Sequence, residues 1–319
     1  MPGILPFDNV TLLRSIEKAQ APADTPIISR HFRNAGVVPS ETVQVDVITG
    51  PEGVMVAISR DAESKKASRE NIDSKTFTIP RFSEKDSVSA GDILRYRQPG
   101  TTNGLLGQAQ LIGRRLGYIK SRLDSTKEIM GIRALQGQVV DGAGNVIATY
   151  PVGQDGAISI AAVNPRIYFD NKAVEISRAL RTSNVKLITY VGKDAYQRLL
   201  LHDDVQALLA GPTGPSMLEN GVLRTLHGVT IERVNGAYTD NQGSEQPYLG
   251  DDGMITTAMG DYFELYHGPC STPSGVALQE VYIDQWATQD PPMAWFRLES
   301  NPLPIVQRPE AVRNATLVA

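Results

Sequence analysis

The feature that most constrains this fold is a long amphipathic pattern over residues 101–137. Apolar side chains recur there in steps of three and four, which places them on one stripe of a helix. A helix of that length would run about 55 Å, well beyond the roughly 30 Å of a small domain. The pattern therefore predicts a long helix that braces an extended body. Its stripe comprises Leu105, Leu106, Ala109, Ile112, Leu116, Ile119, Leu123, Ile129, Met130 and Leu135.

Glycines interrupt this helix at positions 104, 107, 113, 117 and 131. Each glycine costs about 1 kcal/mol relative to alanine in a helix interior. Tertiary packing must therefore hold the helix together. We expect its polar face to meet solvent or a neighbouring subunit. That face carries Arg114, Arg115, Lys120, Arg122, Asp124, Lys127 and Glu128.

The composition and net charge exclude several classes of function. The 319 residues are 41% hydrophobic and 21% charged, which is ordinary for a folded protein, and the net charge is −4. A dedicated nucleic-acid-binding protein needs clustered positive charge, which this sequence lacks. Tight binding of DNA is therefore not expected. Residues 1–20 lack the pattern of a signal peptide, and no apolar run is long enough to span a membrane. With a single cysteine, Cys270, we expect a soluble protein made in a reducing cytoplasm.

The segments before the helix are extended. Residues 1–39 contain five prolines and only a short helical pattern at 10–19, which is typical of an arm. Residues 43–47 and 54–58 alternate between apolar and polar, predicting a β-hairpin. The polar stretch 59–74 and a return strand at 76–79 then predict two long strands with a charged tip. The tip could reach a partner, and the same pattern fits a surface loop equally well.

The rest of the chain predicts an α+β fold. Strands are expected at 138–140, 146–148 and 156–162, and a second domain at about 171–280. That domain would hold helices at 172–181, 193–201 and 204–210, with Asp194 and Asp203 as helix caps. It would also hold strands at 185–191, 222–225, 229–234, 254–267 and 275–286. The tail ends in a strand at 316–319.

No motif in the chain supports catalysis, a cofactor or a metal. Gly142 and Gly144 follow a strand, but another strand follows them, so a hairpin is favoured over a dinucleotide site. The histidines at 31, 202, 227 and 267 are scattered. The cluster His202-Asp203-Asp204 is better explained by helix capping than by acid–base chemistry. Lys65 and Lys66 could form crosslinks between subunits, but ordinary ion contacts are favoured.

Five stretches, in order along the chain, match the pattern of one family. The first is residues 45–50, and the second is the long helix leading into residues 137–140. The third, residues 188–210, carries Ala195-Tyr196 before Asp204-Val205. The last two are residues 234–238 and 307–311. Taken in this order, they resemble the major capsid proteins of tailed bacteriophages, in particular the lambda-like major capsid protein E family with the Hong Kong 97 fold.

The resemblance implies four parts: an N-terminal arm (1–41), an extended loop (42–95), a peripheral domain with a spine helix (96–170 and 281–319) and an axial domain (171–280). It implies hexamers and pentamers of an icosahedral shell around double-stranded DNA, bound without sequence specificity. Scaffolding and portal proteins are implied partners, and a decoration protein is a further candidate. The expected location is the virion capsid, reached from the host cytoplasm.

The loop tip is the predicted contact between subunits, through Arg60, Asp61, Lys65, Lys66, Arg69 and Glu70. Removing residues 59–74 should leave folded subunits that cannot build regular shells. Two alternatives remain at this point. An encapsulin-like nanocompartment would share the fold and package proteins. An enzyme of unrelated α+β fold would need acid, base or metal groups assembled from distant positions.

Overall fold

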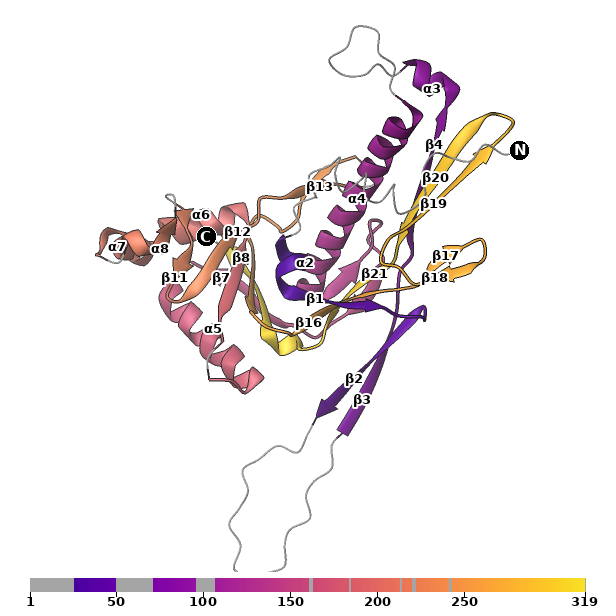
Figure 1. The fold of residues 1–319 in the computed structure, drawn as a ribbon. Coiled ribbons are helices and arrows are strands. Elements are labelled where there is room, and N and C mark those ends of the chain that lie inside the picture. Colours follow the sequence, from indigo (N-terminus) through magenta and orange to yellow (C-terminus); the bar gives the residue numbers. More distant parts are fainter. Residues whose placement is uncertain are drawn as a thin grey trace, which may run out of the picture.

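The computed structural model describes residues 26–49, 71–95, 107–160, 163–183, 185–212, 214–219, 222–240 and 243–318. Helices and strands are mixed in a body with two lobes, and a two-stranded ribbon projects from it (Figure 1). One lobe carries much of a long helix and a three-stranded sheet. The other carries a six-stranded sheet bordered by shorter helices (Figure 1). The predicted α+β class is confirmed.

Helix α4 (Gln108–Gln136) is the predicted long helix. Its 29 residues span about 43 Å at 1.5 Å per residue. Residues 101–106, where the predicted pattern began, lie outside the described part of the chain. The helix ends at Gly137, which has a φ of 104° and donates its N–H to the carbonyl of Ala134. A Cβ at Gly137 would lie 2.9 Å from Val152, so both backbone and packing require glycine here.

The N-terminal half of α4 packs on an antiparallel sheet ordered β19-β20-β4, formed by β19 (Tyr282–Thr288), β20 (Met293–Ser300) and β4 (Phe82–Ser89). The central strand pairs along its length with β4, from Met293 with Ser89 to Ser300 with Phe82. Alternate residues of β20 face the helix because side chains alternate across a strand. Together these elements bury one separate cluster: Val88, Leu111, Ile112, Leu116, Ile119, Leu123, Ile283, Ala294, Phe296 and Leu298.

The C-terminal half of α4 belongs to a larger core. Helix α2 (Pro26–His31) lies against it and leads into β1 (Phe32–Val37). Strand β1 pairs in parallel with β16 (Phe263–His267), which pairs antiparallel with β21 (Pro302–Val306). Met130, Ile132 and Leu135 of the helix are fully buried in this core.

The same core continues into a six-stranded sheet ordered β11-β12-β8-β15-β22-β7. Its strands are β7 (Gly153–Ser159), β8 (Leu187–Val191), β11 (Thr225–Leu226), β12 (Val229–Arg233), β15 (Gly253–Ala258) and β22 (Val312–Val318). Strand β8, expected at 185–191, is buried at every position, as is usual for a strand inside a sheet. The tail strand predicted at 316–319 begins earlier, at Val312, and lies between β15 and β7.

Four helices border this sheet: α5 (Pro165–Leu180), α6 (Lys193–Leu201), α7 (Asp203–Ala210) and the short α8 (Gly214–Met217). Helix α5 begins before the predicted residue 172. The Asn164 side chain caps it by accepting the N–H of Arg166 at 2.9 Å.

The predicted caps of the next two helices are wrong. Gly192 precedes α6, where a Cβ would lie 2.2 Å from the carbonyl oxygen of Gly250. His202 precedes α7, and its Nδ1 accepts the N–H of Asp204 at 3.1 Å. Asp194 and Asp203 lie instead in the first turns, where negative charge favours the helix dipole.

The ribbon consists of β2 (Thr42–Thr49) and β3 (Asn71–Thr78). They pair antiparallel from Thr42 with Thr78 to Thr49 with Asn71, and they point away from the body (Figure 1). The predicted return strand is thus present, but it begins at Asn71, inside the stretch expected to be a charged tip. The expected first partner of β2, residues 54–58, lies outside the described residues.

The remaining elements are small. Strands β5 (Gln138–Val140) and β6 (Val146–Thr149) form the predicted hairpin in place of a dinucleotide site. Its turn spans residues 141–145, and Asp141 Oδ1 accepts the N–H groups of Ala143 and Asn145 within it. The other short elements are α3 (Ala90–Arg95), β9 (Leu218–Glu219), β10 (Val222–Leu223), β13 (Ala237–Thr239), β14 (Glu245–Pro247), β17 (Cys270–Thr272), β18 (Gly275–Ala277) and the 3₁₀ helix Pro309–Ala311.

Candidate functional site at the root of the ribbon

The six predicted contact residues of the loop tip lie within residues 50–70, outside the described part of the chain. They are Arg60, Asp61, Lys65, Lys66, Arg69 and Glu70. What the structure describes is the root of the ribbon, where the chain leaves β3 and enters β4. The side chains that hold this root decide how the ribbon leaves the body.

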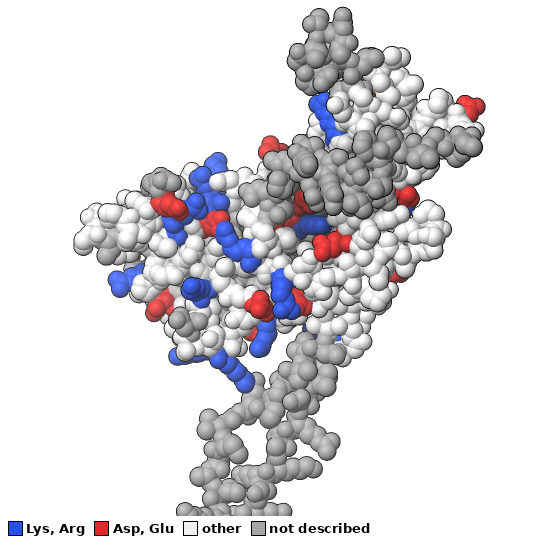
Figure 2. All heavy atoms as spheres, in the orientation of Figure 1, with Lys and Arg blue, Asp and Glu red and all other residues white. Residues whose placement is uncertain are grey.

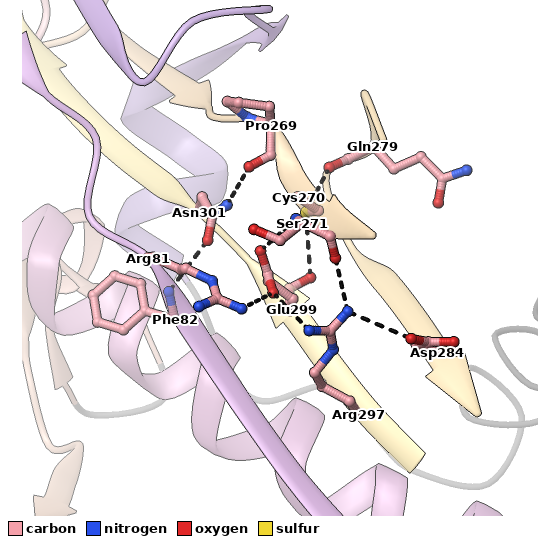
Figure 3. A network of polar contacts seen from close by, with 10 residues as sticks. All are labelled: Arg81, Phe82, Pro269, Cys270, Ser271, Gln279, Asp284, Arg297, Glu299 and Asn301. Carbon is pink, nitrogen blue, oxygen red and sulfur yellow. Dashed lines mark hydrogen bonds and ion pairs between the residues drawn. The ribbon is translucent and has the colours of Figure 1, made fainter. Parts of the chain in front are cut away.

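Glu299, near the end of β20, lies at the centre of the root (Figure 3). Its side chain is fully buried and accepts hydrogen bonds from Arg81 Nη2 at 2.8 Å and from the N–H of Ser271 at 2.8 Å. Burial acts to raise the pKa of Glu299, but these hydrogen bonds outweigh it and lower the pKa. The carboxylate is therefore charged, and Arg81 supplies the opposite charge that a buried ion needs.

Asn301 holds the next residue of the root. Its Oδ1 accepts the N–H of Phe82 at 3.2 Å, and its Nδ2 donates to the carbonyl of Pro269 at 2.6 Å (Figure 3). Glu299 and Asn301 therefore bind two consecutive residues of the chain that joins β3 to β4. Both lie at the junction of β20 and β21, so the root is fixed to the centre of the molecule rather than to its edge.

Arg297 and Cys270 complete the cluster. Arg297 Nη2 donates to the carbonyl of Ser271 at 2.7 Å and lies 3.5 Å from Asp284 Oδ2 (Figure 3). The Cys270 thiol is buried, and its Sγ lies 3.4 Å from the carbonyl oxygen of Gln279. Burial raises the pKa of Cys270 to about 11, and the negative charge of Glu299 adds to the shift. The thiol therefore stays protonated and acts as a packing group.

A second contact fixes the chain that leads in from the N-terminal residues. Glu128 of α4 is 1% exposed, and its two carboxylate oxygens accept the N–H groups of Ile27 at 2.9 Å and Ile28 at 3.1 Å. A Cβ at Gly131, one turn further, would lie 2.5 Å from Ile28 Cδ1. Helix α4 thus provides a carboxylate that accepts the first N–H groups of α2, and a gap at Gly131 that the Ile28 side chain occupies.

The polar face of α4 was expected to meet solvent or a neighbouring subunit, and this is wrong at Glu128, which is buried against α2. Arg115 lies 3.3 Å from Asp92 and 3.6 Å from Asp86, so it binds the helix to β4 and α3. Burial also lowers the pKa of Lys127. Arg122 does meet solvent, because its side chain is 71% exposed even though it forms an ion pair with Glu84 of β4.

Sequence reasoning missed this root cluster. A signal was present, because Glu299, Ser300 and Asn301 stand between two mainly apolar stretches, 294–298, which contains Arg297, and 302–306. Polar residues between two strands usually indicate an exposed turn. Here the two strands join without leaving the core, and all three residues are buried. Only the arrangement of β4 and β17 around them distinguishes the two cases.

Charged side chains of both signs are mixed on the face of the body drawn in Figure 2. Among the described residues, no three or more His, Cys, Asp or Glu side chains gather as metal ligands would. In the same part of the chain, no helix is long and apolar enough to cross a membrane. The described polar clusters thus bind segments of this chain to one another.

Comparison with known proteins gives consistent matches. A family model described as phage major capsid protein E matches residues 8–317. A curated major capsid protein of Salmonella phage Felix O1 is 24% identical over 323 residues, covering 88% of each chain. A protein ascribed to the capsid of a prophage in E. coli CFT073 superposes with a TM-score of 0.66 at 12% identity, covering 99% of this chain and 100% of that one. The capsid of cyanophage P-SCSP1u gives 0.55 at 10% identity, covering 94% and 90%.

Proposed function

Because this chain belongs to the phage major capsid protein E family, we propose that its copies form the hexamers and pentamers of an icosahedral head enclosing double-stranded DNA. The family match covers nearly the whole chain, and the resemblance noted in the sequence is confirmed. The chain is thus a phage major capsid protein, a component of the virion capsid that assembles into multi-subunit shells. An encapsulin-like role is not better supported.

We propose the following division: arm at 1–41, extended loop at 42–95, peripheral domain at 96–170 and 281–319, and axial domain at 171–280. The ribbon and the cluster between α4 and the sheet β19-β20-β4 support it. The parts are firmly joined. Strand β4 of the proposed loop pairs along its length with β20 of the peripheral domain, and β7 and β22 share a sheet with β8.

The observation that carries this proposal is the ribbon. A lone two-stranded hairpin is marginally stable in water. Thr42, Gln44, Lys75, Thr76 and Thr78 of this ribbon are exposed, yet Glu299 and Asn301 anchor its root in the core. Val43 on the other face is buried and Phe77 packs against Tyr150, so the ribbon is held at its base and exposes one face there. Such an exposed face suits a surface on another copy. Repeated from copy to copy, such contacts close rings, and the rings can assemble into a shell. Each contact can be weak because many act together.

The test is to shorten the ribbon at its last described pair. Thr49 and Asn71 are partners, so an Asn-Gly dipeptide in place of residues 50–70 could close the strands through a two-residue turn. The variant should keep the circular dichroism and melting temperature of the parent yet form no regular shells in electron microscopy. A matched variant carries a Gly/Ser linker of the original length. It separates the need for reach from the need for Arg60, Asp61, Lys65, Lys66, Arg69 and Glu70.

If reach alone matters, the Gly/Ser variant should assemble and the shortened one should not. If the charged residues carry the contact, both should fail while remaining folded. Regular closed shells from the shortened variant would refute the role given to the ribbon.

We further propose that assembly occurs in the host cytoplasm with separate scaffolding and portal proteins, and with a decoration protein as a further candidate. Contact with DNA would be weak and independent of sequence, which the net charge of −4 and the mixed charges in Figure 2 support. Electron microscopy of the chain expressed with and without its neighbouring genes tests these partners one at a time.

A further inference from the structure

Strand β1 connects α2 to the ribbon. It follows α2, which leads in from the N-terminal residues, and it precedes the ribbon strand β2. Within the described residues it pairs on one side only, with β16, and is an edge of its sheet. The pairing is interrupted between Asn34 and Gly36, where Gly36 has a φ of 89°. An irregular edge strand is among the easiest parts of a sheet to release.

A buried histidine lies at the first end of this strand pair. His31 is 3% exposed and packs edge-on against Tyr190 and Phe263, with ring centroids 5.5 Å and 5.9 Å away. Its Nε2 lies 2.8 Å from the Tyr190 hydroxyl, and its Nδ1 has no partner among the described residues. The nearby charged groups are Arg30, which also contacts Tyr190, and its ion-pair partner Glu232. The buried carboxylate of Glu128 acts electrostatically on the Tyr190 hydroxyl.

A second buried histidine lies at the other end. His267 pairs with Val37, and its carbonyl accepts the N–H of Val38 at 2.9 Å. The side chain is 1% exposed, and neither ring nitrogen has a partner in the described part of the chain. Lys127 of α4 and Glu280 are the charged groups that act on it, and Asp124 and Lys120 act in turn on Lys127.

Both sites accept a neutral ring far better than a charged one. A proton on either ring would bring a second positive charge beside Arg30 or Lys127 in a place that water does not reach. Besides the backbone pairing with β16 and the buried Phe32, two polar side-chain contacts oppose release of the strand. Arg33 pairs with Glu264 of β16 at 2.6 Å, and Asn34 donates to Glu280 at 2.6 Å.

We propose that β1 is an acid-releasable strap, freed from β16 when His31 and His267 take up protons, while α4 and the six-stranded sheet remain folded. Release would loosen the one described strand between α2 and the ribbon strand β2. The proposal concerns the subunit and does not depend on how the shell is built.

Burial of the two rings determines the direction of the pH dependence. Desolvation lowers the pKa of both rings from 6.5 to about 4, with Arg30 adding to the shift at His31 and Lys127 at His267. A released ring would titrate near its ordinary value. The closed state is therefore fully favoured above pH 6.5 and loses stability as the pH falls toward 4. Between pH 7.5 and 5.0, the opening equilibrium should rise about 30-fold for each ring that release exposes.

Hydrogen exchange of the full chain at pH 7.5 and 5.0, scaled for the intrinsic pH dependence of amide exchange, tests this. Peptides covering residues 32–38 should exchange at least 10-fold faster at pH 5.0, while those from α4 and β8 keep their protection. His31→Gln and His267→Met should each reduce the pH response of the strap. His227→Asn, at an exposed turn with a φ of 50°, is the matched control and should leave it unchanged.

The wild-type protein alone can overturn the proposal, so it does not depend on either variant folding. Equal protection of residues 32–38 at both pH values would contradict it. Equal loss of protection in the strap, α4 and β8 would indicate general acid unfolding and would also contradict it. So would a strap response that survives in both histidine variants.

Discussion

The two halves of helix α4 lie in different cores. The N-terminal half packs with β4, β19 and β20 in a cluster of its own, whereas the C-terminal half is part of the large core that runs through α2, β16, β21 and the six-stranded sheet. Between them, Asp124 and Lys127 are half-buried and Glu128 is buried against α2. One helix thus joins a small core, which supports the ribbon root, to a large one.

This difference indicates separate stabilities. The small cluster draws its strands from residues 82–89 and 282–300, and it can loosen while the six-stranded sheet stays intact. A defect in the large core should instead spread through most of the subunit. The ribbon root lies at the boundary, because Glu299 belongs to β20 and Asn301 leads into β21.

Cavities made in the two cores should have the largest effect on the free energy of unfolding. Leu116 and Leu135 are both 0% exposed, one in each cluster, and replacing either with alanine should cost about 2–5 kcal/mol. Hydrogen exchange should then differ between the variants. Leu116→Ala should speed exchange in β4 and β20 alone, and Leu135→Ala should also affect β8. If Leu116→Ala loosens β8 equally, the two cores form one cooperative unit and the comparison fails.

Neutralising the ribbon root should have the next largest effect. Glu299→Gln removes the charge that binds Arg81, and we expect a loss of about 2 kcal/mol in the free energy of unfolding. Faster exchange should begin at the root, in residues 79–83. Glu310→Gln breaks the exposed pair with Arg308, 3.1 Å apart, and should change stability by less than about 0.5 kcal/mol. Similar losses from both variants would show that the buried root has no special role.

Removing the acceptor for α2 should have a smaller effect. Glu128→Ala leaves the N–H groups of Ile27 and Ile28 without their bonds, at a cost of about 1–2 kcal/mol. Chemical denaturation measures the total, and exchange of residues 26–31 shows whether α2 is the part released. Unchanged protection of α2 would mean that apolar packing alone docks this helix.

The helix glycines should give the smallest effects, and the two positions should respond differently to alanine. Around Gly113 an added Cβ would meet no atom within 4 Å, so Gly113→Ala should stabilise the helix by up to about 1 kcal/mol. At Gly131 the same change forces Ile28 to move and should remove that gain. Adding Ile28→Val should restore part of it. Melting temperatures of the three variants check this, and equal stabilisation by both alanines would contradict the close contact.

Local patterns carried much of the fold. The stripe over α4 correctly identified Ile112, Leu116 and Leu123 as buried, because helical periodicity requires only neighbouring residues. The mainly apolar stretch 185–191 correctly indicated a strand, β8. Alternation marked β2, but its described partner is β3 and residues 54–58 lie outside the described part. Pairing depends on distant segments, which a strand's own pattern does not specify.

The candidate site, in contrast, could not be predicted from local patterns. Nothing in the local pattern distinguishes Glu128 from the charged residues beside it on α4, and its burial results from the approach of α2 from about a hundred positions away. Glu299 resembles a turn residue until Arg81 and Ser271 are placed around it.

By itself, the sequence determined the long helix, the mixed α+β class and the extended pair of strands, since these follow from the spacing of apolar side chains along the chain. Only the tertiary structure decided which charges are buried and which segments hold the arm and the ribbon. The reason is physical. A buried carboxylate is stable only where donors from other segments surround it, and those donors meet it only once the chain has folded.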